Sequence, residues 1–448
     1  MTGESLSRPG AAVGRAAGII APRRAALQGK ALEVTTQVLL VMLLPRFLGP
    51  AEFGRLTVAL TIVTLASVTL SLGAPSSFAR FLPAEAADRR AGLARSMTLQ
   101  LLRVRSAQLV IAAGLGAALV LVAPARFALR DTGLVFLALV AEVAAVLAAQ
   151  IALGIGRTWV WSFRIAAKNA ALLVAVPLLF HLLGPVGLLQ SILLSSVAGL
   201  VFAGWTVLGL ISRAERGIPI PAGAARYGIV AGLALLVGQL TYRGPVLAAT
   251  ALAGSAVETG FAALAGSVAM AIMLAVREVF TVSLPELVEH WGRDRGHAEG
   301  LLRRLGWWAE AALVPSALAG VAVVGHGLPL VAGQQFTPAV GTLVPILALF
   351  PLLPLPLLGW QGAALRLRPE VALEINAAGL LAFLATAVLL VPLWGARGAS
   401  AGLLAAVAAS SLLTAWLLPT SVPPRLLMVG MLGSLGVLAL AAMMGLAR

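Results

Sequence analysis

The sequence lacks cysteine altogether and is poor in charged residues. None of its 448 residues is Cys, and only 11% are Asp, Glu, Lys or Arg. Without cysteine, disulfide bonds and thiolate chemistry are excluded, and the cysteine content gives no information about the redox compartment. A water-soluble domain of this size needs far more polar surface than so few charges provide. The composition therefore excludes a water-soluble protein.

Motifs for catalysis, metal binding and nucleotide hydrolysis are also missing. The chain has no GxxxxGK[ST], HExxH or GxSxG sequence. Its histidines are scattered: His181, His290, His297 and His326. We therefore predict no catalytic residue, no metal site and no cofactor, and we expect that the chain is not an enzyme. Any energy that the protein consumes must then come from a gradient of H⁺ or Na⁺, from the membrane potential or from the substrate.

Long apolar runs are what the sequence has in abundance. Hydrophobic residues make up 60% of the chain, and the mean hydropathy is +0.99. Runs of about 20 apolar residues, each long enough to cross the ~30 Å hydrocarbon core as a helix, recur from end to end. These runs do not alternate in polarity, which excludes a β-barrel. The sequence thus predicts an all-α polytopic membrane protein with thirteen spans, at about 27–48, 55–75, 103–123, 133–154, 159–181, 186–210, 226–250, 257–280, 308–330, 339–360, 371–393, 398–418 and 424–446.

Positive charge is distributed unevenly around these spans. The net charge is +15, and with a cytoplasmic N-terminus 25 of the 32 Lys and Arg residues fall on the cytoplasmic side. This distribution follows the positive-inside rule. Basic loop residues of a membrane protein orient the chain and contact anionic headgroups, so we predict the lipid bilayer as a partner and no nucleic acid. Residues 1–26 are predicted to be a cytoplasmic tail and show no signal peptide.

A short motif occurs twice, about half a chain apart. Its first copy contains Gly49, Glu52 and Gly54, and its second copy contains Gly254, Glu258 and Gly260. The two glutamates are 206 positions apart. Three further matches follow in the same order at offsets of 205 to 211: Leu153-Gly154 with Leu358-Gly359, Asn169-Ala-Ala with Asn376-Ala-Ala, and Gly184-Pro-Val-Gly187 with Gly395-Ala-Arg-Gly398. Their constant order indicates an internal duplication.

The duplicated unit holds six predicted spans, an even number, so both copies keep the same orientation in the membrane. We therefore predict two parallel six-helix bundles, 27–212 and 226–420, joined by a cytoplasmic linker at 213–225. An additional membrane helix is expected in 421–448. Transporters built from two such repeats place their substrate site between them, near the middle of the membrane.

Three cations in the spans are candidates for that site. Arg164 and Lys168 lie in the fifth span, seven and eleven residues after Arg157, so all three share one helical face. Lys168 lies well inside the apolar run, where binding of an anionic group explains it better than contact with lipid phosphates. Arg243 lies inside the membrane if the seventh span continues past Gly244-Pro245. If the helix breaks there, Arg243 only marks an interface.

Two carboxylates lie in spans as well. Glu142, at the centre of the fourth span, is a candidate proton or ion site or counter-ion, with a structural ion pair as the alternative. Glu33 is a weaker candidate because Lys30 is near it in the sequence. We predict that a further set of polar residues lines the cavity: Gln37, Thr61, Thr64, Gln239, Asn169 and Asn376. For the threonines, bonding to their own helix is the alternative.

Four stretches carry a resemblance to a known family: LLPRFLGPAEFG (43–54), LSLGAPSSFARFLP (70–83), LAGSAVETGFAALAG (252–266) and INAAGLLAFLATAVLLVPLWGARGASAG (375–402). With the two-times-six plan, they resemble polysaccharide (O-antigen-type) flippases of the multidrug/oligosaccharidyl-lipid/polysaccharide exporter superfamily. This resemblance implies a MATE-like fold in the bacterial cytoplasmic membrane. The implied cargo is a polyprenyl-diphosphate-linked glycan, and the implied partners are other polysaccharide-assembly membrane proteins. Family members often carry an acidic residue near the middle of the seventh span, where this chain has Tyr242-Arg243.

Two other functions are compatible with parts of the sequence. One is that of another secondary transporter, either a MATE-type drug antiporter or a major-facilitator protein. Asp88-Arg89-Arg90-Ala91-Gly92 is similar to a facilitator loop. That loop lacks its preceding glycine, and the linker between the halves is short for a facilitator. A membrane-bound glycan polymerase or glycosyltransferase would need a large outer loop, and every predicted outer loop is short.

Overall fold

The fold is built from long helices in the part of the chain that the structure, a computed structural model, describes. Those residues are 10–71, 73–82, 85, 88–122, 128–215 and 217–446, and no strand occurs among them. The α-helices are α1 (Gly10–Leu70), α2 (Ala74–Phe81), α3 (Arg90–Val122), α4 (Leu129–Gly154), α5 (Thr158–Leu183), α6 (Pro185–Ser212), α7 (Ala224–Leu252), α8 (Ala256–Arg293), α9 (Arg295–Ala332), α10 (Val340–Leu349), α11 (Pro354–Leu365), α12 (Pro369–Leu417) and α13 (Pro424–Met443). Two 3₁₀ segments, η1 (Gln334–Ala339) and η2 (Phe350–Leu352), flank α10.

Eleven helical segments of the described chain are long and apolar enough to cross a membrane, and two of them contain two predicted spans each. Within α1 the backbone leaves helical geometry at Gly49 (φ 73°), and within α12 it does so at Gly395 (φ 54°). Glycine adopts such positive φ values without steric penalty, so the chain can turn there between two helices. The prediction of an all-α membrane fold is confirmed for the described residues.

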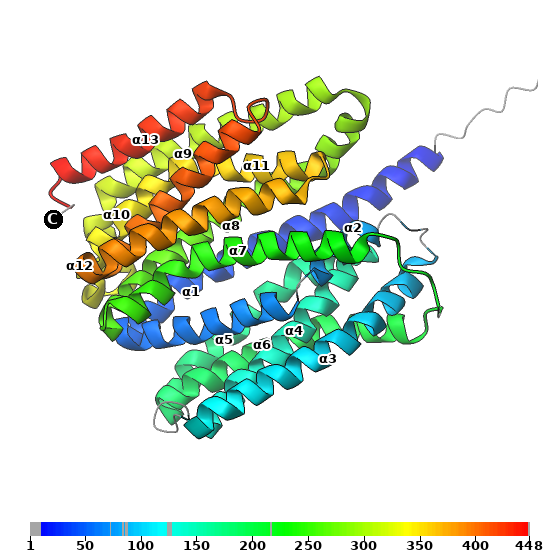
Figure 1. The fold of residues 1–448 in the computed structure, drawn as a ribbon, viewed down its shortest axis with the longest axis horizontal. Helices are drawn as coiled ribbons and strands as arrows, with labels where there is room; N and C mark the ends of the chain where they lie inside the picture. Colours follow the sequence, from blue (N-terminus) through cyan, green and yellow to red (C-terminus); the bar gives the residue numbers. More distant parts are fainter. Residues whose placement is uncertain are drawn as a thin grey trace, which may run out of the picture.

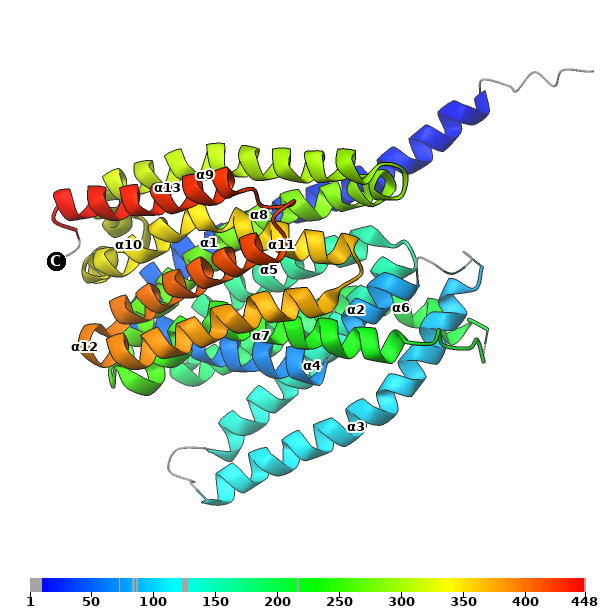
Figure 2. The same ribbon diagram turned by 45° about the horizontal axis from the view of Figure 1, so that its top comes forward.

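The two halves of the sequence lie on opposite sides of the molecule (Figure 1). Helices α3–α6 form one side and α8–α13 the other, with α1 and α7 between them. Helix α3 lies at the outside of its half, as Figure 2 shows, and little of its most apolar stretch is buried. The predicted division at 213–225 falls on the connection between α6 and α7. The domain boundaries themselves stay a prediction.

The ends of the chain differ in part from the predicted tail and last helix. Residues 10–26 of the predicted tail belong to α1, so that part is helical. Residues 1–9 lie outside the described residues, as do residues 447–448 at the end of the additional helix. Helix α13, which lies in the segment predicted to hold the additional helix, packs against α9 and α10.

The two copies of the sequence motif pack against each other at one end of the molecule, here called the Gly54 end. A Cβ on Gly54 would lie 2.9 Å from the Gly260 nitrogen, and a Cβ on Gly260 would overlap the Pro50 carbonyl. Glycine is needed here because the two backbones touch directly. Beside this contact, three rings pack edge-on at centroid distances of 6.2 and 6.0 Å: Phe336 against Phe53 and against Phe261.

The opposite end, here called the Lys30 end, has a second backbone contact between the halves. A Cβ on Gly73 would overlap the carbonyl group of Gly228 in α7. The Ser77 hydroxyl in α2 donates a hydrogen bond to the Ala224 carbonyl over 2.9 Å. The two halves are therefore in contact at both ends of the membrane-spanning region.

The two repeats differ in how they fix their turns. Glu258 accepts a hydrogen bond of 2.7 Å from the Ala396 backbone N–H, beside the turn within α12. In the first repeat the position matching Ala396 is Pro185, which has no N–H to donate. The matching carboxylate, Glu52, instead pairs with Arg55 over 2.5 Å. The carboxylates of the two copies therefore bind different partners: Glu258 binds a backbone N–H beside the turn, and Glu52 binds an arginine side chain.

We predict that Gly260→Ala destabilises the protein and that Gly436→Ala does not. The added methyl group at 260 meets the Pro50 backbone, and overpacking of this kind costs about 1–3 kcal/mol. A Cβ on Gly436 of α13 would meet no described atom within 4 Å, so alanine there gains helix propensity of about 0.5–1 kcal/mol. Thermal unfolding in detergent measures both variants; equal midpoints would contradict the tight contact.

Candidate functional site

A cavity of about 410 Å³ lies between the two halves. Its walls come from α1, α2, α4, α5, α7 and α8. Ten of the eleven residues predicted for the site line it: Glu33, Gln37, Thr61, Thr64, Glu142, Arg164, Lys168, Asn169, Gln239 and Arg243. Residues that are far apart in the sequence thus converge on one chamber, in the place where a two-repeat transporter has its site.

The α5 cations share one carboxylate in this cavity. Lys168 Nζ lies 2.7 Å from Glu142 Oε2, and Arg164 Nη1 lies 3.3 Å from Glu142 Oε1. The three side chains are nearly buried, with 14%, 11% and 8% of Lys168, Arg164 and Glu142 exposed. One carboxylate balances only one of the two positive charges, so the cluster keeps an excess charge. Arg157, at the start of α5, is exposed and does not line the cavity.

Arg243 adds a third cation from the other half. Helix α7 continues through Pro245 to Leu252, so Arg243 lies inside a membrane helix, as the first of our two interpretations required. Its Nε donates to Gln239 Oε1 over 3.3 Å, and its charge interacts with that of Glu142. The centre of the cavity therefore holds three cations around one carboxylate, an excess of two positive charges.

The repeat-related asparagines have different surroundings, and one prediction is wrong. Asn169 lines the cavity and donates to Thr36 Oγ1 (3.3 Å) and Gln37 Oε1 (3.4 Å). Asn376 is not part of the lining. It is buried between α12 and α7, where it donates to the Ala234 carbonyl over 2.8 Å. The reason is packing: α12 lies directly on α7, so the amide joins two helices of the same half.

The threonines of the second predicted span combine both of the roles that we considered, lining the cavity and bonding to their own helix. Thr57 and Thr64 line the cavity, yet each donates to a carbonyl of its own helix, over 2.8 and 2.7 Å. Thr61 also lines the cavity, and its hydroxyl makes no hydrogen bond among the described residues. Thr61 therefore has hydrogen-bonding capacity that the helix itself does not use.

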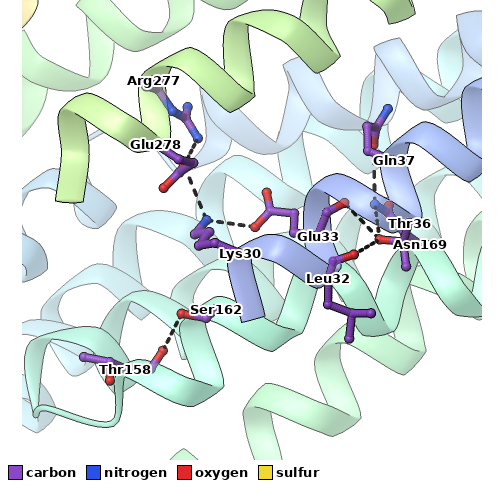
Figure 3. A network of polar contacts seen from close by, with 10 residues as sticks. All are labelled: Lys30, Leu32, Glu33, Thr36, Gln37, Thr158, Ser162, Asn169, Arg277 and Glu278. Atoms are coloured by element: carbon purple, nitrogen blue, oxygen red, sulfur yellow. Dashed lines mark hydrogen bonds and ion pairs between the residues drawn. The ribbon is translucent and has the colours of Figure 1, made fainter. Parts of the chain in front are cut away.

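A charged network at the Lys30 end was not predicted (Figure 3). Lys30 Nζ lies 2.8 Å from Glu33, 3.5 Å from Glu278 of α8, and 3.8 Å from the centre of the Trp161 ring. Glu278 also pairs with Arg277 over 3.0 Å. The spacing of Lys30 and Glu33 by three residues signals their pairing on one helix. No sequence signal connects them to α8, because that contact depends on how the halves pack.

Carboxylates and imidazoles do not gather into a metal site in the described part of the chain. No group of three or more His, Cys, Asp or Glu residues there could hold a metal ion. The cavity carboxylates Glu33 and Glu142 are paired with cations. What these cavity residues can provide is electrostatic binding and hydrogen bonding.

Comparison with solved structures identifies the fold; no protein-family model and no curated protein matches the chain. A lipid II flippase MurJ in an inward closed conformation has a TM-score of 0.65 at 12% identity, covering 95% of this chain and 93% of that chain. An outward-facing MATE multidrug resistance transporter of the MOP superfamily has a TM-score of 0.59 at 16% identity, covering 94% and 97%. A MOP superfamily transporter from Pyrococcus furiosus, described by the reverse polarity of its binding pocket, has a TM-score of 0.53 at 15% identity, covering 94% and 96%.

These similarities extend over nearly the whole of each chain. Together with the helical segments suited to crossing a membrane, they define a class: a multi-pass membrane protein of MATE-like fold. This chain presents, within that fold, a cavity whose centre holds three cations and one carboxylate, and two of these cations pair with the carboxylate.

We predict that Glu142→Gln destabilises the protein by roughly 3 kcal/mol, because removing one partner leaves buried cations without their counter-charge. Restoring the balance with Lys168→Gln in the same chain should recover part of this loss. Glu370→Gln, at the exposed start of α12, is the matched control and should change stability little. Thermal unfolding measures the set; a Glu142→Gln variant as stable as the control would refute the counter-ion role.

Proposed function

We propose that this protein is a transporter and not an enzyme: a flippase that moves a polyprenyl-diphosphate-linked oligosaccharide across the bacterial cytoplasmic membrane for polysaccharide biosynthesis. The observation that carries the proposal is the excess of two positive charges around Glu142, inside a cavity between two helical halves. A diphosphate carries negative charge that would balance this excess. Arginine and lysine are the side chains that proteins use to hold phosphate oxygens.

Other features of the cavity suit the rest of such a substrate. Amide and hydroxyl groups of Gln37, Thr61 and Gln239 line it beside the cations and can hydrogen-bond sugar hydroxyls. The volume of about 410 Å³ falls within the range of ligand pockets. The polyprenyl chain would stay in the surrounding lipid. One protein of similar structure is a lipid II flippase, which supports a lipid-linked substrate for this fold.

A MATE-type drug antiporter is the second candidate, because similar structures include a MATE multidrug resistance transporter. The charge of the cavity argues against a cationic drug, since Arg164, Lys168 and Arg243 would repel it. Coupling to H⁺ or Na⁺, association with polysaccharide-assembly membrane proteins, and a cytoplasmic N-terminus all belong to the flippase proposal.

We predict that Arg243→Gln weakens binding of a polyprenyl diphosphate about tenfold or more, equivalent to about 1.4 kcal/mol. Arg243 is the test residue because it is hydrogen-bonded to Gln239, so its removal leaves the Glu142 ion pairs in place. Tryptophan quenching in lipid nanodiscs measures the affinity, with the neutral polyprenol as comparison ligand. Arg130→Gln, at an exposed position of α4, is the control. Equal affinity for diphosphate and polyprenol would overturn the proposal.

We further propose that the two halves open in turn to the two sides of the membrane, with the Lys30 end facing the cytoplasm. The ion pair between Lys30 and Glu278 joins the halves at this end. Each partner has a second ion pair within its own half, Lys30 with Glu33 and Glu278 with Arg277, so both charges stay paired when the halves separate. The Gly54 end is held by backbone contact and aromatic packing instead.

We predict that Glu278→Gln increases cytoplasmic access to the cavity about fivefold, equivalent to about 1 kcal/mol, since the ion pair between the halves is lost. The chain has no native cysteine, so Thr64→Cys in the cavity wall provides a single labelling site. The measurement is the rate of maleimide labelling in inside-out vesicles. Glu299→Gln, which breaks a pair with Arg366 away from the cavity, is the control. An unchanged rate in Glu278→Gln would contradict this role of the pair.

A further inference from the structure

Glu310 is a buried carboxyl group outside the central cavity. It lies in α9 with 2% of the residue exposed, and it does not line the cavity. Neither of its carboxyl oxygens has a hydrogen-bond partner among the described residues. Three other buried carboxylates, Glu33, Glu142 and Glu278, each pair with at least one cation. Glu310 therefore needs a different explanation.

The carboxyl group lies where α9, α13 and η2 meet. A Cβ on Gly430 of α13 would lie 3.2 Å from Glu310 Oε1 and 2.8 Å from the Pro351 carbonyl oxygen. Nearly one turn further along α13, a Cβ on Gly433 would lie 3.1 Å from side-chain atoms of both Val314 and Pro351. The absence of side chains at these two glycines thus makes room for the carboxyl group and for a main-chain carbonyl of η2.

This carbonyl belongs to a broken membrane helix. The 3₁₀ turn of η2 interrupts the segment from α10 to α11, and Pro351, Pro354 and Pro356 follow one another closely. Proline has no N–H, so helical partners are missing for carbonyls at the break. One of them, the Leu352 carbonyl, accepts from the Ser411 hydroxyl over 3.3 Å. In membrane proteins the carbonyls of interrupted helices are where small cations, including protons, bind.

The helices around Glu310 offer no opposite charge close to it among the described residues. α10, η2 and α11 contain no Asp, Glu, Lys, Arg or His. The charged residue of α13 is Arg425, which is exposed in the first turn of that helix. On α9, the cations nearest to Glu310 in sequence are Arg303 and Arg304, and both are exposed. His326 is about four turns of α9 away from Glu310. An ionised carboxylate without a partner is very unfavourable in such surroundings. The group must therefore be neutralised by a ligand of its own.

We propose that Glu310 is a proton-binding site: it is held as a carboxylic acid whose O–H donates to the Pro351 carbonyl, joining α9 to the broken helix beside α13. A proton fits better than a metal cation, because hard cations take several oxygen ligands. Of the three atoms nearest to a Cβ on Gly430, two are oxygens, of the Glu310 carboxyl and the Pro351 carbonyl, and the third is a carbon of Leu355. The site stands independently of the flippase proposal.

Infrared spectroscopy of the full chain in lipid at neutral pH tests the proposal. A protonated carboxylic acid has a C=O stretching band that is separate from the bands of ionised carboxylates. We expect this band in the wild type, its loss in Glu310→Gln, and its retention in Glu299→Gln, whose carboxylate pairs with Arg366 over 2.7 Å. Absence of the band from the wild type, or its full persistence in Glu310→Gln, would overturn the proposal.

A second variant keeps Glu310 and tests its partner, so the proposal remains falsifiable if Glu310→Gln fails to fold. In Gly430→Ala the added methyl group lies against both the carboxyl group and the Pro351 carbonyl, so we expect the C=O band to shift to higher frequency. Gly436→Ala, on the same helix and without a described neighbour within 4 Å, should leave the band in place. An unshifted band in Gly430→Ala would refute the hydrogen bond to Pro351.

Discussion

The constraint on which this structure depends is that a charge inside a membrane needs an opposite charge or a proton as its partner. Lys30 meets it with two carboxylates, Glu33 and Glu278. Glu142 meets it with two cations of α5, which leaves positive charge in excess. That excess lies in a cavity between the halves. The charge imbalance at the cavity centre is therefore also the basis of the anionic substrate that we propose.

Close contact between backbones determines where the halves meet. Gly54 lies against Gly260 at one end, and Gly73 lies against Gly228 at the other. The first pair comes from the duplicated motif, so the same local sequence forms both surfaces of one interface. At the Lys30 end the contact also includes an ion pair across the halves, and each of its two charges has another partner within its own half. Both ends therefore share a backbone contact at glycine, and they differ in the ion pair at one end and the aromatic packing at the other.

The fold by itself does not determine which substrate a protein of this fold transports. Proteins with this fold at 12–16% identity include a lipid II flippase and a multidrug resistance transporter. Function resides in the side chains that a shared scaffold presents. In this chain the cationic side chains in the cavity are Arg164, Lys168 and Arg243, and their charge is the basis on which we propose an anionic cargo over a cationic drug.

The sequence by itself determined the helical membrane class and ten of the residues that line the cavity, because these depend on apolar run length and on helical spacing. Tertiary structure decided the rest. Asn169 and Asn376 match in the repeat, yet only the first lines the cavity, since α12 packs on α7 and covers the second. Arg243 stays in a helix because α7 continues through its proline. A partner of Lys30 and the surroundings of Glu310 come from helices that are distant in sequence. Local sequence patterns do not predict these contacts, because the contacts form only when the helices pack.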